Sequence, residues 1–128
     1  MDVTRQLRLL AASLMMLTGI IHLALTDPLT TDVVALTWMA VMALFGLLYV
    51  AIGIGLLASK QISFYLGAII PLVGACVAAY HYVVVKPELV LLVFMMDPLI
   101  VIDIIVIPCC CYIILHKTPS RPPELSKH

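Results

Sequence analysis

Long apolar stretches separated by short polar breaks run through most of the chain. Four of them are long enough to cross the ~30 Å hydrocarbon core of a bilayer as helices, at ~1.5 Å per residue. They cover residues 8–26, 33–58, 62–85 and 98–116. The pattern therefore predicts an all-α fold, an integral membrane four-helix bundle over residues 1–117, followed by a polar tail at 118–128.

Local signals set the ends of the first three spans. Pro28 follows the first apolar run and cannot continue a helix without losing a backbone hydrogen bond. Asp32 stands where an N-cap is expected before the second span. The polar break at 59–61 is short, so the second and third spans are expected to be antiparallel neighbours.

The last apolar region allows two interpretations. A single helix over 88–116 would be about 43 Å long, which exceeds the bilayer core unless the helix tilts strongly. Asp97 followed by Pro98 is a typical N-cap and first-turn pair. We therefore expect a short interfacial or re-entrant helix at 87–96 and a separate last span at 98–116, with a single long kinked helix as the alternative.

Composition supports a membrane protein and narrows the partners. The chain is 64% hydrophobic and only 11% charged, which is outside the range of ordinary soluble domains. No basic cluster resembles a nucleic-acid footprint, so the expected partners are the lipid bilayer and other membrane subunits. By the positive-inside rule, we expect a multi-pass protein of the cell membrane with both termini in the cytoplasm. Lys86 alone falls on the outer side, whereas the cytoplasmic side carries Arg5, Arg8, Lys60, Lys117, Arg121 and Lys127.

Three ionisable residues are expected to share one layer near the outer ends of the spans. His22 and His81 each lie four residues from the end of their span, about 6 Å deep, and Asp103 lies about 9 Å from the start of the last span. A charged group at such depth is costly, so an intramembrane carboxylate facing two imidazoles is a candidate functional site.

Several chemistries fit a site of His22, His81 and Asp103. Two imidazoles and one carboxylate could bind a copper or zinc ion. The same groups could support proton relay or quinone binding, and the two His could ligate a haem. The structural alternative is a buried hydrogen bond or ion pair that only fixes the helix register. The triplet Cys109–Cys111 could be a soft-metal or acylation site, but consecutive helical residues point in different directions, so the three thiols do not form a chelate by themselves. We expect these cysteines to act as small apolar fillers.

The first part of the chain resembles a known family. The run from Arg8 to Leu23, with Gly19 and His22 near its end, and the glycine-rich run from Gly46 to Gly55 are similar to the start of DoxX-like small four-helix membrane proteins. The resemblance covers roughly the first 58 residues. It implies a four-helix bundle of a kind sometimes associated with quinone-linked respiratory oxidoreductases. Only Gly19 and His22 can be carried over from the family's pattern to this chain.

These observations give two functional expectations. The first is an accessory, non-catalytic subunit of a larger membrane complex, a respiratory or metal-dependent oxidase or oxygenase, to which the His22, His81 and Asp103 site contributes. The alternative is an independent, oligomeric small transporter or channel that uses Asp103 as its coupling carboxylate.

Overall fold

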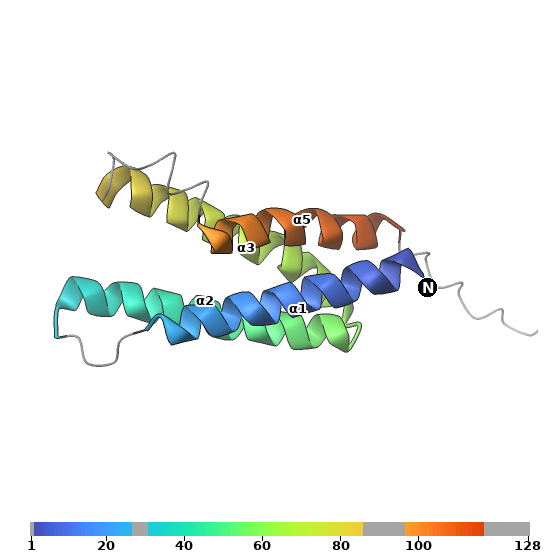
Figure 1. The fold of residues 1–128 in the computed structure, drawn as a ribbon, viewed down its shortest axis with the longest axis horizontal. Helices are drawn as coiled ribbons and strands as arrows, with labels where there is room; N and C mark the ends of the chain where they lie inside the picture. The colour runs from blue at the N-terminus through green and yellow to red at the C-terminus, as the bar shows by residue number, and fades with distance from the viewer. Residues whose placement is uncertain (1, 27–30, 86–96, 117–128) are drawn as a thin grey trace, which may run out of the picture.

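Four α-helices make up the regular structure of the described residues. The computed structural model describes residues 2–26, 31–85 and 97–116 (Figure 1). In these ranges α1 runs over Val3–Ala24, α2 over Val33–Leu57, α3 over Gln61–Val85 and α5 over Pro98–His116. The helices coincide closely with the expected spans, and each is long and apolar enough to cross a membrane.

Side-chain caps explain where the helices begin. α1 starts at Val3 rather than at residue 8, because the Asp2 carboxylate accepts a hydrogen bond from the Thr4 N–H at 3.1 Å. Asp32 caps α2 as expected, accepting from the N–H groups of Val34 and Ala35. α5 starts at Pro98, and Asp97 accepts from the Leu99 N–H at 2.9 Å. The expected interfacial helix at 87–96 and the tail at 118–128 lie outside the described residues.

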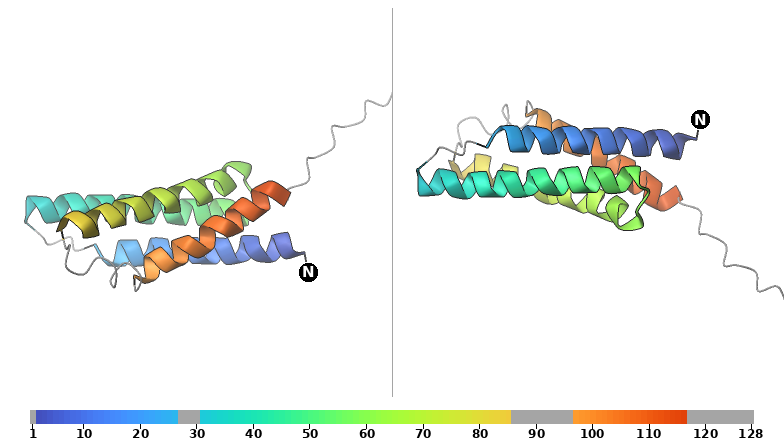
Figure 2. Two further views of the ribbon diagram at one scale, coloured as in Figure 1. Left: turned by 90° about the horizontal axis from the view of Figure 1, so that it is seen from above. Right: turned by 90° about the horizontal axis from the view of Figure 1, so that it is seen from below.

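The helices form a four-membered ring. α1 packs against α2 and α5, and α3 packs against the same two helices, so α2 and α5 are diagonally opposite. Figure 1 shows α1 and α2 running side by side as one layer, while α3 starts next to the end of α2 and rises toward α5. Figure 2 shows the same oblique course of α3 and α5 from two further sides. Because α3 diverges from α2, the bundle is wider at the end that holds the start of α2, near Val33.

Glycines bring α1 and α2 into backbone contact. A Cβ atom on Gly19 would lie 2.7 Å from the Gly46 carbonyl oxygen and 2.9 Å from the Val50 nitrogen, both on α2. A Cβ atom on Gly53 would lie 2.6 Å from the Met16 Cγ atom of α1. Gly19 and Gly53 therefore allow α1 and α2 to approach each other closely.

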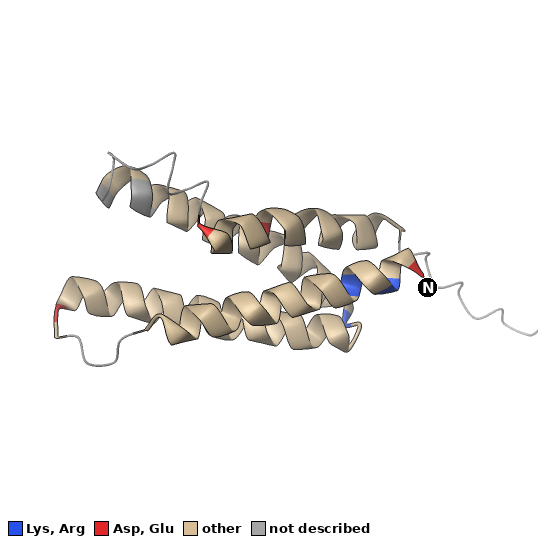
Figure 3. Cartoon of the chain, viewed as in Figure 1, with Lys and Arg blue, Asp and Glu red and all other residues tan. Residues whose placement is uncertain are grey.

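The outer surface of the described bundle is apolar, and charged residues gather at its ends. Large apolar side chains on all four helices are more than half exposed, among them Ile20, Leu36, Ile62 and Leu115. Figure 3 shows Lys and Arg at the end that holds the start of α1 and the α2–α3 turn, together with one acidic residue at the start of α1, whereas the other acidic residues lie at the start of α2 and on the first part of α5. A surface of this kind fits contact with lipid and suggests a multi-pass membrane protein.

Candidate functional site

A buried carboxylate and a buried phenol form the centre of the candidate site. The Tyr49 hydroxyl of α2 lies 2.9 Å from each carboxylate oxygen of Asp103 on α5 and donates to them. Asp103 is 4% exposed and Tyr49 is 1% exposed. Asp103 of α5 thus has a hydrogen-bond partner on another helix, and that partner is a tyrosine.

His22 joins this pair from α1. Its ring stacks on the Tyr49 ring, with the ring centroids 5.3 Å apart and the planes 18° from parallel. The His22 Nδ1 atom lies 2.8 Å from the Thr18 carbonyl oxygen, one turn earlier in α1. A carbonyl only accepts, so Nδ1 carries the proton, and in the neutral ring Nε2 is a hydrogen-bond acceptor.

The backbone of α3 also packs closely against the Tyr49–Asp103 pair. A Cβ atom on Gly74 would lie 3.0 Å from the Tyr49 hydroxyl oxygen and 3.7 Å from the Asp103 Oδ2 atom. Phe45, one turn before Tyr49 on α2, packs tilted against the tyrosine ring at 6.4 Å between centroids. All four helices therefore meet at the Tyr49–Asp103 hydrogen bond.

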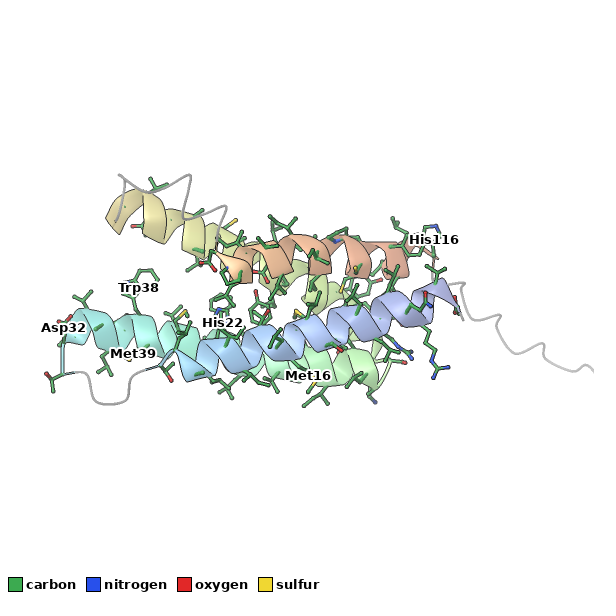
Figure 4. All side chains as sticks on the ribbon, in the orientation of Figure 1. Met16, His22, Asp32, Trp38, Met39 and His116 are labelled. Carbon is green, nitrogen blue, oxygen red and sulfur yellow. The ribbon has the colours of Figure 1, made fainter. Side chains whose placement is uncertain are left out.

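This junction is the polar end of a cavity of about 530 Å³. Residues from all four helices line it, and most of them are apolar. Phe45 and Trp38 contribute aromatic walls, and Asp97 and Pro98 at the start of α5 also line it. Figure 4 shows Trp38 pointing from α2, and His22 from α1, into the space between the α1–α2 layer and the α3–α5 layer. An apolar cavity with a few convergent polar groups is the usual form of a small-molecule site.

The structure thus brings together two of the three expected site residues. His22 and Asp103 line one cavity, with Tyr49 between them. His81 lies near the end of α3, but its side chain is outside the described part, so its role in the site stays a prediction. Among the described side chains, no group of three or more His, Cys, Asp or Glu is placed to hold a metal ion. A copper or zinc site therefore depends on His81 and stays a prediction too.

Tyr49 is the site residue that sequence reasoning missed. It shares the buried face of α2 with Gly46, Ile52 and Gly53, so it stands in a stripe of small and buried residues. A phenol on such a face needs a hydrogen-bond partner. The spacing of Gly46, Tyr49 and Gly53 carries that signal, because the three residues lie on the same face of α2.

Two of the three cysteines of α5 pack inside the bundle. Cys109 and Cys110 are buried, Cys111 is exposed, and all three are free thiols. The Cys110 sulfur faces Gly67 of α3, where a Cβ atom would lie 2.8 Å away. This contact explains a small residue at position 67 and gives Cys110 a packing role between α3 and α5.

Comparison with protein-family models, with curated proteins and with solved structures gives no match for this chain.

Proposed function

We propose that this chain is a multi-pass protein of the cell membrane with both termini in the cytoplasm. Four helices of sufficient length and hydropathy support insertion. The described basic residues Arg5, Arg8 and Lys60 lie at the end of the bundle that holds the N-terminus, and Asp32 and Asp97 lie at the other end. That distribution supports the orientation by the positive-inside rule.

Within the membrane, we propose that the protein binds an apolar small molecule in the cavity and serves as an accessory, non-catalytic subunit of a larger complex, a respiratory or metal-dependent oxidase or oxygenase. The observation that carries the proposal is the Tyr49–Asp103 pair in the lining of an apolar cavity. A carboxylate inside a membrane bundle is costly, and helix packing alone needs only small residues. A ligand-binding role would account for the presence of Asp103 and His22 inside an otherwise apolar bundle.

The proposed chemistry follows from the groups that line the cavity. Binding of an apolar redox molecule such as a quinone, or transfer of protons to one, needs only His22, Asp103 and the Tyr49 hydroxyl. Binding of copper or zinc, or of haem, needs His81 as a further ligand. Quinone binding or proton transfer is better supported than metal or haem binding, because the side chains that it needs are all described and line the cavity.

Purification in mild detergent from the native membrane tests the subunit proposal. We expect partner subunits to co-purify with the tagged chain and to separate from it only in harsh detergent. Recovery of a homo-oligomer alone would contradict the subunit proposal.

A second candidate function, an oligomeric transporter or channel, is favoured by one observation. Asp103 is one of the residues that line the cavity, so a solute inside the cavity could contact its carboxylate. Transport would then appear as pH-dependent flux in liposomes that contain only this chain, and Asp103→Asn would abolish it. Flux that persists in the Asp103→Asn variant would contradict a coupling role for the carboxylate.

A further inference from the structure

We propose that the cavity accepts an apolar molecule with a protonated amine head group, whose ammonium is held by Asp103 and whose apolar body fills the space toward Trp38. The inference rests on the proposed function in one respect only, namely that the cavity is a ligand site, and it replaces the quinone considered there by an amine. It adds the chemical class of the ligand, from charge, hydrogen-bond polarity and aromatic lining.

Charge gives the first argument. The described residues that line the cavity include two carboxylates, Asp97 and Asp103, and neither Lys nor Arg. The Asp97 side chain caps α5 by accepting from the Leu99 N–H, so it has a structural task. Asp103 is 4% exposed, and the hydrogen bonds that its carboxylate accepts from another described side chain come from one neutral donor, the Tyr49 hydroxyl. Burial makes the anionic form of a carboxylate costly, and a partner of opposite charge offsets part of that cost; an ammonium would supply such a partner.

Hydrogen-bond polarity gives the second argument. Tyr49 directs its proton to Asp103, so its oxygen offers only lone pairs to the cavity. Neutral His22 has its proton on Nδ1, bonded to the Thr18 carbonyl, so Nε2 is an acceptor. The polar end therefore presents acceptors from three side chains. An ammonium brings three donors, whereas a carboxylate, a phosphate or a quinone carbonyl brings further acceptors.

The aromatic lining gives the third argument. Phe45 and Tyr49 pack together beside Asp103, and Trp38 lies nearer the start of α2 on the same cavity. Aromatic faces attract cations, most strongly where water is excluded, and they also bury apolar groups. A cavity of about 530 Å³ accommodates a compact apolar cage or a branched alkyl body next to the carboxylate.

Three probes with the same hydrocarbon cage and different head groups test the proposal. Adamantan-1-amine, adamantan-1-ol and adamantane-1-carboxylate are dialysed against the full chain in lipid nanodiscs, and binding to empty nanodiscs is subtracted. We expect the amine to bind at least about tenfold more tightly than the alcohol, since charge-assisted hydrogen bonds are about twice as strong as neutral ones. The carboxylate should bind most weakly.

Two variants assign the binding to the cavity and to the carboxylate. Ala78→Phe puts a large side chain on the α3 wall and should abolish binding of all three probes. Asp103→Asn keeps the side-chain shape and an oxygen that accepts from Tyr49, and it should reduce amine affinity to that of the alcohol. Trp38 is the single tryptophan of the chain, so its fluorescence reports occupancy of the cavity directly.

The outcomes separate this inference from the proposed function. If the alcohol or the carboxylate binds as tightly as the amine to the unchanged protein, and Ala78→Phe removes that binding, the cavity is a ligand site but the ammonium proposal is wrong. If no probe binds, or if Ala78→Phe has no effect on binding, the cavity is not the ligand site and the proposed function fails with it. The comparison of head groups uses the unchanged protein, so it does not depend on whether Asp103→Asn folds.

Discussion

The Tyr49 hydroxyl donates to the Asp103 carboxylate across the diagonal of the bundle, between two helices that are not neighbours in the ring. The residues are 54 positions apart in the chain, and the hydrogen bond is 2.9 Å long to each oxygen. His22 of α1 and Gly74 of α3 enclose it from the remaining two helices. One hydrogen bond therefore links the positions of all four helices, and its surroundings also form the polar end of the cavity.

Removing the Tyr49 hydroxyl should destabilise the bundle. In Tyr49→Phe the Asp103 carboxylate loses the donor that the structure assigns to it, and a buried acceptor without a partner costs about 1–3 kcal/mol. The free energy of unfolding in detergent measures the loss. Tyr65→Phe is the matched control, because Tyr65 is 47% exposed, and its effect should stay within about 0.5 kcal/mol.

Replacement of both partners separates the lost hydrogen bond from lost packing. Tyr49→Phe combined with Asp103→Leu removes the donor and the acceptor together, so the unfolding free energy should recover most of the way to that of the unchanged protein. A double variant as unstable as the sum of the two single variants would mean that the hydrogen bond is not the main contribution of either residue.

Gly74→Ala should disturb the same junction from the side of α3. The added Cβ atom would lie 3.0 Å from the Tyr49 oxygen, which is too close without a shift, and overpacking of this kind costs about 1–3 kcal/mol. The effect should be much smaller when Gly74→Ala is introduced into Tyr49→Phe, where the oxygen is gone. Equal losses of unfolding free energy in both backgrounds would contradict the contact.

Two glycines of the α1–α2 contact should differ in their tolerance of alanine. At Gly19 the new Cβ atom would meet the backbone of Gly46 and Val50, which cannot rotate away, so the helices must separate. At Gly53 the closest atom, at 2.6 Å, belongs to the flexible Met16 side chain, which can adopt another rotamer. Thermal unfolding should therefore show a larger loss for Gly19→Ala than for Gly53→Ala. The reverse order would mean that α1 and α2 pack in another register.

Helix positions could be predicted from the sequence much better than the site. The starts of α2 and α5 follow from Asp32 and from the Asp97–Pro98 pair, because a side-chain cap is a local interaction that the sequence displays directly. The apolar run that predicts the first span begins at residue 8, whereas α1 begins at Val3, because the Asp2 cap extends the helix through Arg5 beyond the apolar run.

The site depends on geometry that local patterns do not contain. Counting depth along each helix brought His22 and Asp103 to one layer, and both do line the cavity. It could not show that Tyr49 joins them, because this depends on how helices that are distant in the chain cross. The cavity depends on the divergence of α3 from α2, a property of packing between helices.

The position of the proton on His22 is a further prediction. The contact between Nδ1 and the Thr18 carbonyl requires the Nδ1–H tautomer in the neutral ring. Long-range ¹H–¹⁵N correlation spectra of histidine-labelled protein at a pH where the ring is neutral should show Nδ1 protonated and Nε2 unprotonated. The opposite tautomer would remove Nε2 as an acceptor and would weaken the argument for a donor head group on the ligand.

The most direct test of the central claim is to identify what the cavity holds. Small molecules released by denaturing the protein purified from its native membrane are compared by mass spectrometry between the unchanged chain and Ala78→Phe, whose phenyl ring would occupy the cavity. The account predicts a stoichiometric apolar molecule in the unchanged protein and its loss from the variant, with lipid content otherwise the same. No such molecule in the unchanged protein, or the same amount in both, would contradict a ligand site at the Tyr49–Asp103 junction.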